Sequence, residues 1–260
     1  KNICDIEKEL GIYKSPSINL NINEQNEEKY ELILKHKIKI VSFTFGLPSQ
    51  KWIDTFKKHN IYLIGNCTNL KEALEIEQAG LDAVVAQGIE AGGHRGSFLN
   101  QNDKQDEIGL FSLLQELKQF IKIPIIAARG ILTGQSMLAA KILGASAVQI
   151  GTGFLLTRES GASLTYKQSL LNSRAHDTVL TANISGKKAR GINNTLIEKT
   201  GLNNGKIYAY PIQNALTKEI RSHAAHIKNS EYMSLWCGQS IGCMKEIISV
   251  KNFVDQLLYE

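Results

Sequence analysis

The sequence has few cysteines, few prolines and no long hydrophobic run. Its cysteines, Cys4, Cys67, Cys237 and Cys243, include no Cys-x-x-Cys pair, so neither a disulfide framework nor a zinc-type ligand set is expected. No apolar stretch approaches the roughly 20 residues needed to cross a bilayer, and the polar first residues lack a signal-peptide pattern. We therefore expect free thiols in a cytoplasmic protein without a membrane partner.

A strong excess of either charge is also absent. The formal net charge is +5, and the basic residues are scattered along the chain. Because basic and aromatic residues do not interleave, we expect no nucleic-acid partner, although a mildly basic protein suits an anionic ligand. With 43% hydrophobic residues, the 260-residue chain is long enough for one large α/β domain, alone or with a smaller one.

What the sequence does contain is an alternation of short apolar runs with amphipathic stretches, which is typical of βα units. Asn69 and Glu72 predict a helix start with a capping box, and Gly80 predicts the end of that helix. Residues 166–245 are predicted to be mostly helical, and 246–258 to form a final amphipathic helix. The β-branched runs predict parallel strands over 38–43, 61–65, 83–86, 124–128 and 147–151.

The number of strands bears on the fold class. A closed (β/α)8 barrel needs eight parallel strands, and the sequence predicts five. Either the sheet is open, or three N-terminal strands of a barrel are not in this chain.

The loop after the third predicted strand carries the first candidate site. Residues 87–96 read QGIEAGGHRG, and ligands of parallel α/β proteins bind at such carboxyl ends of strands. Gly92 and Gly93 let the backbone approach a flat ligand or a phosphate, and His94 titrates near neutrality, which suits proton abstraction. The structural alternative is a tight glycine turn with a solvated histidine. The position after a buried strand favours the functional interpretation.

The ends of the next two predicted strands also carry glycines. Gly130 lies in AARGI, and Gly151 and Thr152 lie in QIGTG. Backbone N–H groups at such strand ends hold phosphate oxygens, and a threonine hydroxyl can add a donor. Either motif alone is weak, but the pair at adjacent strand ends predicts a phosphate site.

The other histidines give weaker signals. His36, His59 and His176 lie in polar surroundings and are expected at the surface. His223 and His226 stand three apart in a predicted helix, which permits a metal pair, but no third ligand is evident and no metal site is predicted. The aromatic residues expected to line a pocket or fill the core are Phe45, Tyr208, Tyr210 and Trp236.

Together these stretches resemble the motifs of the FMN-dependent nitronate monooxygenases, formerly called 2-nitropropane dioxygenases. The loop 87–96 resembles the central motif of that family, and the similarity extends over residues 37–245. The other segments that match, in chain order, are SFTFGLP at 42–48, AARGI at 127–131, QIGTGFL at 149–155, YPIQNALT at 210–217 and LWCGQ at 235–239.

The resemblance implies a TIM-type (β/α)8 barrel that is incomplete at the N-terminus in this chain. Residues 37–165 and 246–260 would form the FMN-binding barrel domain, and residues 1–36 and 166–245 a small, mostly helical substrate or lid domain. The implied partners are O2 and a small nitronate or nitroalkane, with propionate 3-nitronate as a physiological substrate. The resemblance leaves open whether the protein is a monomer or a dimer.

The resemblance also assigns roles to individual residues. Gln87 would hydrogen-bond the flavin ring, with Gly92 and Gly93 close to it. His94 would remove the α-proton of a neutral nitroalkane or orient an anionic nitronate, and NAD(P)H would not be needed. The residues that would hold the FMN phosphate are Gly130, Gln149, Ile150, Gly151 and Thr152.

Three features depart from the family pattern. Thr44 stands where the family commonly has histidine, and Arg129 stands where it has glycine, next to the expected phosphate site. Family members also begin with strands that contribute an Ala-Pro-Met segment and an asparagine to the flavin site. Because a barrel without those strands would expose sheet edges, we expect the native protein to be longer or another polypeptide to supply them.

Two other functions are compatible with the sequence. The flavin-dependent enoyl-acyl-carrier-protein reductases share the fold and a similar Gly-Gly-His loop, but they would consume NAD(P)H. The wording EAGGHRG, with YPIQN and LWCGQ, favours the monooxygenase. The third possibility is a non-catalytic truncated paralogue that no longer binds FMN, which Thr44 and Arg129 would support.

Overall fold

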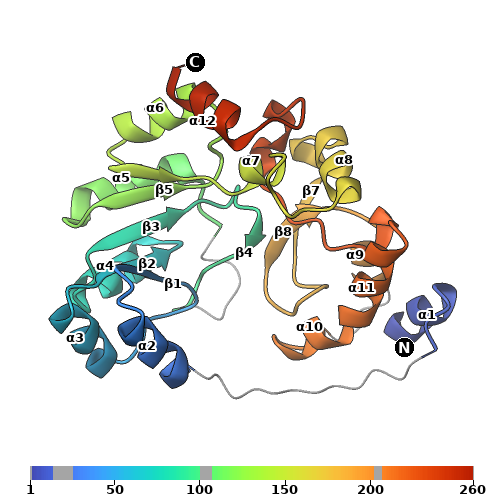
Figure 1. Ribbon diagram of the computed structural model, residues 1–260, viewed down its shortest axis with the longest axis horizontal. Helices are drawn as coiled ribbons and strands as arrows, with labels where there is room; N and C mark the ends of the chain where they lie inside the picture. The colour runs from blue at the N-terminus through green and yellow to red at the C-terminus, as the bar shows by residue number, and fades with distance from the viewer. Residues whose placement is uncertain (1, 14–25, 100–106, 202–206, 260) are drawn as a thin grey trace. The chain divides into compact units, whose positions relative to one another are not determined.

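The computed structural model describes residues 2–13, 26–99, 107–201 and 207–259 (Figure 1). They fall into two compact units, here called the sheet unit (23–91, 95–150 and 255–260) and the hairpin unit (1–22, 92–94 and 151–254). The chain passes from one unit to the other at residues 91–92, 94–95 and 150–151, among other places. The domain boundaries expected at 36/37, 165/166 and 245/246 stay a prediction. The two compact units divide the chain at other positions.

The sheet unit is built on a parallel sheet with the order β1-β2-β3-β5-β6. The strands are β1 (Ile40–Phe43), β2 (Tyr62–Cys67), β3 (Ala83–Gln87), β5 (Ile125–Ala128) and β6 (Ala147–Gln149). All neighbouring pairs are parallel, as in the register Val85 to Ile126 between β3 and β5. The sequence prediction of these strands is therefore confirmed to within two residues at each end.

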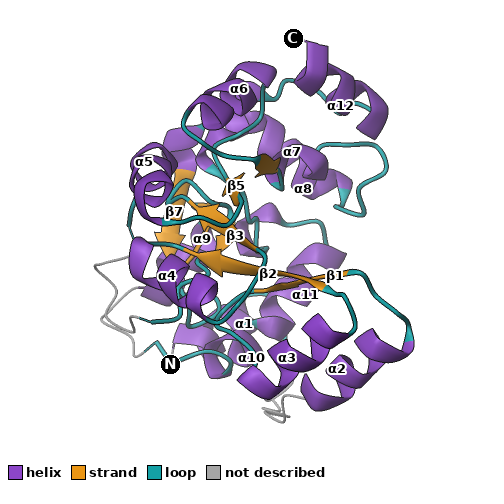
Figure 2. Cartoon of the chain, turned by 90° about the vertical axis from the view of Figure 1, so that its left-hand side faces the viewer, coloured by secondary structure: helices purple, strands orange, loops and turns teal. Residues whose placement is uncertain are grey.

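Helices α3, α4 and α5 lie along one side of this sheet (Figures 1 and 2). The apolar side chains between them and the strands are fully buried, with Phe56, Leu63, Ile76, Leu113 and Leu117 at 0% exposure. Every residue of β3 is buried, whereas β1 and β6, at the two edges, are partly exposed. The helices of this unit are α2 (Asn26–Lys35), α3 (Gln50–Lys58), α4 (Leu70–Gln78), α5 (Leu110–Phe120) and α6 (Gly134–Ile142).

The predicted ends of α4 are confirmed, but the predicted capping box is wrong. The Asn69 side chain accepts from the Glu72 N–H, and Gly80 has φ +88°, the left-handed conformation that glycine adopts easily. The Glu72 carboxylate is fully buried and accepts from the backbone and hydroxyl of Thr68 instead. Its other oxygen accepts from the N–H groups of Phe98 and Leu99. Glu72 thus joins the start of α4 to the segment that follows the 87–96 loop.

We predict that Glu72→Ala lowers the free energy of unfolding by about 3 kcal/mol, because several buried donors lose their acceptor. The matched control is Glu75→Ala, an exposed glutamate on the same helix, which should change it by less than about 0.5 kcal/mol. Urea denaturation of the three proteins measures the difference. Equal stability of the two variants would show that the four hydrogen bonds of Glu72 do not stabilise the fold.

The hairpin unit contains a small antiparallel sheet that the sequence did not predict. It consists of β4 (Gly93–His94), β8 (Ala189–Ile192) and β7 (Thr178–Thr181), in the order β4-β8-β7. The expectation of a mostly helical segment over 166–245 is therefore incomplete. The run Thr-Val-Leu-Thr of β7 is β-branched enough to signal a strand, but its partner Ala-Arg-Gly-Ile is not.

Short helices make up most of the rest of the hairpin unit (Figure 1). The final amphipathic helix is confirmed, although α12 begins four residues later than predicted and its last residues belong to the sheet unit. The helices are α1 (Asn2–Glu9), α7 (Thr152–Leu155), α8 (Leu164–Asn172), α9 (Thr195–Gly201), α10 (Ile212–Leu216), α11 (Lys218–His226) and α12 (Val250–Tyr259). The 3-10 turns are η1 (Ala175–Asp177), η3 (Ser230–Tyr232) and η4 (Gln239–Cys243).

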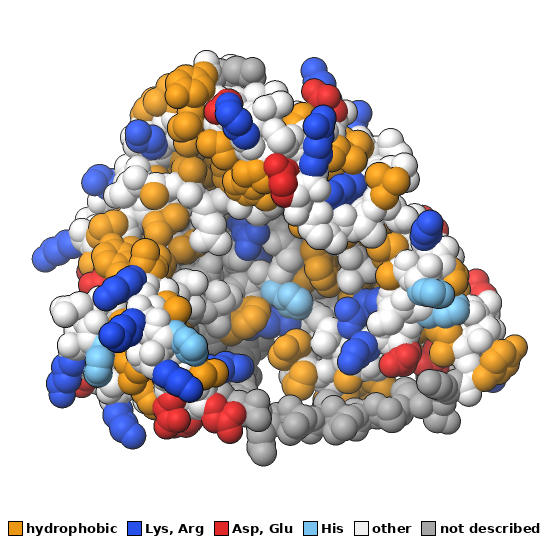
Figure 3. All heavy atoms as spheres, in the orientation of Figure 1, with side chains coloured by type: hydrophobic (Ala, Val, Ile, Leu, Met, Phe, Trp, Pro, Cys, Tyr) orange, Lys and Arg blue, Asp and Glu red, His pale blue; other side chains and the backbone are white. Residues whose placement is uncertain are grey.

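The outer surface of the sheet unit has an apolar area over α6, where hydrophobic side chains gather (Figure 3). Leu138 is 58% exposed and Ile142 76% exposed on this helix. Across the described residues, no helix is both long and apolar enough to span a membrane. The four cysteines are free, as expected, and burial raises the pKa of the Cys237 thiol to about 12, which keeps it unreactive.

Candidate functional site

His94 lies on β4, the two-residue strand that pairs with β8. The register places His94 opposite Ala189 and Gly93 opposite Arg190. Gly93 has φ +73°, and a side chain added there would meet nothing within 4 Å. The backbone next to His94 is therefore open enough for a ligand to approach it closely.

The imidazole of His94 is held by Ser185. The distance from Nε2 to the Ser185 Oγ is 2.8 Å, and Ser185 is 1% exposed. The Ser185 hydroxyl donates its proton to the carbonyl of Lys187 at 3.0 Å. A hydroxyl has a single proton to give, so the Oγ accepts from Nε2–H of the neutral imidazole. The basic nitrogen of this tautomer is Nδ1.

The turn that carries Ser185 connects β7 to β8 and is fixed from α10 and from Thr217, the residue between α10 and α11. Gln213 donates to the carbonyl of Asn183 at 2.7 Å, and the Thr217 hydroxyl donates to the carbonyl of Ile184 at 2.7 Å. Gly186 has φ +84°, and a Cβ there would lie 2.2 Å from the Tyr208 carbonyl oxygen, so no larger residue fits. The segment YPIQNALT thus positions the serine that holds His94.

Two aromatic rings and two cations surround His94. The ring centroids of Trp236 and Tyr210 lie 5.7 Å and 6.3 Å from that of the imidazole. These two aromatic residues are therefore neighbours of His94. Burial lowers the pKa of His94 below its usual value, and the positive charges of Lys187 and Arg221 lower it further. His94 is therefore neutral at pH 7, the form that a general base requires.

We predict that Lys187→Gln raises the pKa of His94, because it removes a positive charge that disfavours the imidazolium. Proton NMR of the imidazole Cε1–H, followed against pH, measures this directly, and His94→Asn identifies the resonance. Lys218→Gln, an exposed lysine of α11, is the control and should leave the pKa unchanged. An unchanged or lowered pKa in Lys187→Gln would contradict the electrostatic account.

The same shift has a consequence for stability. The folded pKa of His94 is lowered, so the unfolded chain binds a proton more readily than the folded one. Above the ordinary histidine pKa, neutral His94 makes its full contribution to the free energy of unfolding. This contribution is lost as the pH falls from that value through the lowered pKa of the folded protein.

Gly92, the next predicted residue, has a structural reason to be glycine. A Cβ there would lie 2.4 Å from the backbone of Cys237 and 2.5 Å from that of Gly238. The N–H of Gly238 in turn donates to the Thr152 hydroxyl at 3.0 Å, so Thr152 already accepts one hydrogen bond. The predicted contacts of Gly92 and Thr152 with a cofactor stay predictions. In the structure both residues lie against Gly238 of the segment LWCGQ.

Gln87 ends β3 in the sheet unit and is bound by Arg95. The Gln87 amide oxygen accepts from the Gly96 N–H at 2.8 Å and from Arg95 Nη1 at 3.2 Å. Arg95 is fully buried and also donates to the carbonyls of Gln87 and Gly88 at 3.0 and 2.5 Å. Because the Gln87 oxygen is committed, any bond from this side chain to a ligand would be donated by Nε2.

The ends of β5 and β6 lie next to each other, as the sequence predicted, since Ala128 pairs with Gln149. Gly130 has φ +72°, and a side chain there would meet only Glu90 carbons at 3.8 and 3.9 Å. Gln149 is exposed and Ile150 half-buried. Arg129 has φ +94°, a backbone conformation that residues other than glycine rarely adopt.

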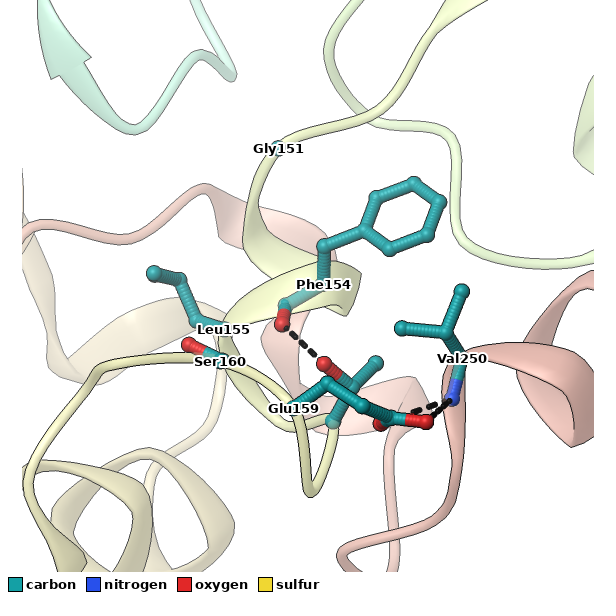
Figure 4. Close-up of a pocket in the computed structure, with 7 residues that line it drawn as sticks. Gly151, Phe154, Leu155, Glu159, Ser160 and Val250 are labelled. Atoms are coloured by element: carbon teal, nitrogen blue, oxygen red, sulfur yellow. Dashed lines mark hydrogen bonds between the residues drawn. The ribbon is translucent and has the colours of Figure 1, made fainter.

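A surface pocket of about 290 Å³ begins at Gly151, the residue before α7 (Figure 4). Phe154 and Val250 form apolar parts of its wall, and the Glu159 carboxylate accepts from the Val250 N–H at 3.1 and 3.0 Å. The pocket shares Gly151 with the predicted phosphate site, which stays a prediction.

Comparison with known proteins connects these features. The sequence model of the family described as "Nitronate monooxygenase" matches residues 5–260. The chain belongs to the nitronate monooxygenase family. The resemblance stated from the motifs alone is therefore confirmed, and so is the α/β fold with its parallel sheet.

Family members with curated sequences are substantially similar to this one. A probable nitronate monooxygenase of Staphylococcus haemolyticus (strain JCSC1435) is 44% identical over 228 residues, which are 87% of this chain and 64% of that protein. One of Staphylococcus aureus (strain Newman) is 44% identical over 227 residues, with the same coverage. The chain thus spans 64% of the length of these relatives.

Solved structures show the same fold. A nitroalkane oxidase from Streptomyces ansochromogenes has a TM-score of 0.90 and 30% identity, over 98% of this chain and 73% of that one. FabK from Thermotoga maritima has a TM-score of 0.76 and 30% identity, over 92% of this chain and 72% of that one.

Within this nitronate monooxygenase family member, sequence reasoning had missed Ser185, Lys187, Arg221 and Arg95. The first three lie far from His94 in sequence, and only the fold brings them to it. Arg95 was visible as part of the loop motif, but nothing in the motif indicated that it is buried. His223 and His226 lie on α11, and no group of three or more potential metal ligands occurs in the described part of the chain.

Proposed function

We propose that the protein oxidises alkyl nitronates, propionate 3-nitronate among them, with FMN as cofactor and O2 as oxidant, and that His94 is its base. The observation that carries this proposal is the placement of His94, which is bonded through Nε2 to Ser185 and flanked by Trp236 and Tyr210, where burial lowers its pKa. A nitroalkane needs a base of this kind, since its α-proton must be removed before oxidation. Membership of the nitronate monooxygenase family supports the proposed reaction.

The residues present fit a flavin. Gly93 and Gly130 have positive φ, and the space of a side chain at Gly93 is open, so a flat ring can reach the backbone there. Gln87 would donate its amide N–H to an acceptor of the ring, and Gly130, Gln149, Ile150, Gly151 and Thr152 would hold the phosphate. Bound FMN would supply the redox step between substrate and O2.

The chain's own residues would bind and deprotonate the substrate. Nδ1 of His94 would accept the α-proton of a neutral nitroalkane, and Ser185 would hold the ring in the required tautomer. Lys187 and Arg221 would favour an anionic substrate. Arg221 is anchored for this, since its guanidinium donates to Asn214 and Thr217. A nitronate is already deprotonated, so it would need the positive charges of Lys187 and Arg221 but not the base.

The proposed function is tested on the purified protein with added FMN. We expect the absorbance of bound oxidised flavin and uptake of oxygen with propionate 3-nitronate in the absence of NADH. NADH oxidation with an enoyl thioester and no uptake with nitronate would identify an enoyl reductase instead. Absence of flavin binding would identify a non-catalytic paralogue.

We predict that His94→Asn lowers turnover of neutral nitroethane by on the order of 100-fold or more, because the general base is lost. Turnover of the pre-formed ethyl nitronate should fall by only a few-fold, since its α-proton is already gone. An oxygen electrode measures both rates. Equal losses on the two substrates would remove His94 from the role of base.

We predict that Ser185→Ala acts through His94 as the loss of a positioning residue. Turnover of neutral nitroethane should fall by about tenfold, because the imidazole loses the acceptor that selects its tautomer, while ethyl nitronate and FMN affinity change little. Nitrogen-15 NMR of His94 should show a mixture of tautomers in the variant. An unchanged tautomer with unchanged turnover would contradict the assignment.

A further inference from the structure

Arg129 is a non-glycine residue with a left-handed backbone conformation at the end of β5. It follows the last residue of β5 and has φ +94°, which glycine would adopt without strain. The family motif it resembles has glycine there. Strain of this kind persists where the surrounding structure enforces it, and it is concentrated at ligand sites. A second property of the residue shows what kind of ligand that is.

The side chain of Arg129 is half-buried and has no counter-charge in the described part of the chain. Its Nε is buried and makes no hydrogen bond to any described residue, and burial lowers the pKa of the guanidinium. A desolvated cation is unfavourable unless an anion compensates it. The described residues thus provide no anionic partner for this guanidinium.

The acid beside the next residue does not compensate the guanidinium. Glu90 lies beside Gly130, with carbons 3.8 and 3.9 Å from the position of a Cβ there. Both of its carboxylate oxygens accept from the N–H of Leu110 at 3.1 Å, and Glu90 is not among the causes of the Arg129 shift. Gly130 follows Arg129 with a left-handed backbone, and the end of β6 lies next to the end of β5.

We propose that Arg129 binds the phosphate group of FMN, an inference that rests on the proposed function and deepens it. A guanidinium offers two parallel N–H donors to a phosphate, which a lysine cannot do, and its charge is retained at every physiological pH. Arg129 would therefore make this chain depend on the phosphate of its flavin more than a relative with glycine at that place. Riboflavin, which has the same ring but no phosphate, would gain nothing from it.

The test compares FMN with riboflavin, using quenching of flavin fluorescence on titration with the apoprotein. We expect Arg129→Gln to weaken FMN binding at least tenfold and riboflavin binding less than twofold. Arg129→Lys, which keeps the charge but loses the paired donors, should fall between. Lys122→Gln, an exposed lysine just before β5, is the charge-matched control and should leave both affinities unchanged.

Arg129→Gly protects the test against misfolding, because it removes the strained backbone as well as the charge. It should melt no lower than the parent protein without flavin and should gain less than the parent when FMN is added. Equal FMN affinity in Arg129→Gln and the parent, or equal losses for FMN and riboflavin, would overturn the inference while leaving the proposed function intact. A parent protein that binds neither flavin would overturn both.

Discussion

The loop between β3 and β4 depends on one fully buried guanidinium. Arg95 donates to the carbonyls of Gln87 and Gly88 and to the Gln87 side chain, and these bonds close the loop on itself. The cost of burying a charge is offset here by hydrogen bonds from Nη1 to oxygen acceptors. Gln87 starts this loop. Its position in the sheet unit therefore depends on the guanidinium of a residue eight positions later.

The strand beneath the loop explains why it can be held so firmly. β3 is the central strand of the parallel sheet and is buried along its whole length, whereas β1 and β6 have one neighbouring strand each and are partly exposed. A loop that leaves a central strand starts from backbone with hydrogen bonds on both sides. Glu72 adds to this from α4, since it accepts from Phe98 and Leu99, just after the loop returns.

The parts that the sequence predicted are those decided by neighbours in the chain. β-branched runs between glycines located the parallel strands, and Asn69 and Gly80 located the ends of α4, because those signals act within a few residues. The capping box predicted for Glu72 is wrong because its buried carboxylate accepts hydrogen bonds from other residues, one of them from the N–H of Phe98, 26 residues away. Ser185 could not be predicted, since it lies 91 residues from His94 and only the β7–β8 hairpin brings it there.

Two arginines of the sheet unit differ in their hydrogen bonds. Nη1 of Arg95 donates to three oxygens of Gln87 and Gly88, although its Nε, like that of Arg129, is a buried atom that makes no bond of its own within the described part of the chain. Arg129 combines a desolvated guanidinium with a backbone conformation that glycine would adopt without strain. Both the desolvated guanidinium and the strained backbone lower the stability of the fold. Because folding alone would favour glycine there, an arginine at the end of β5 is explained by an anion that binds after the fold has formed.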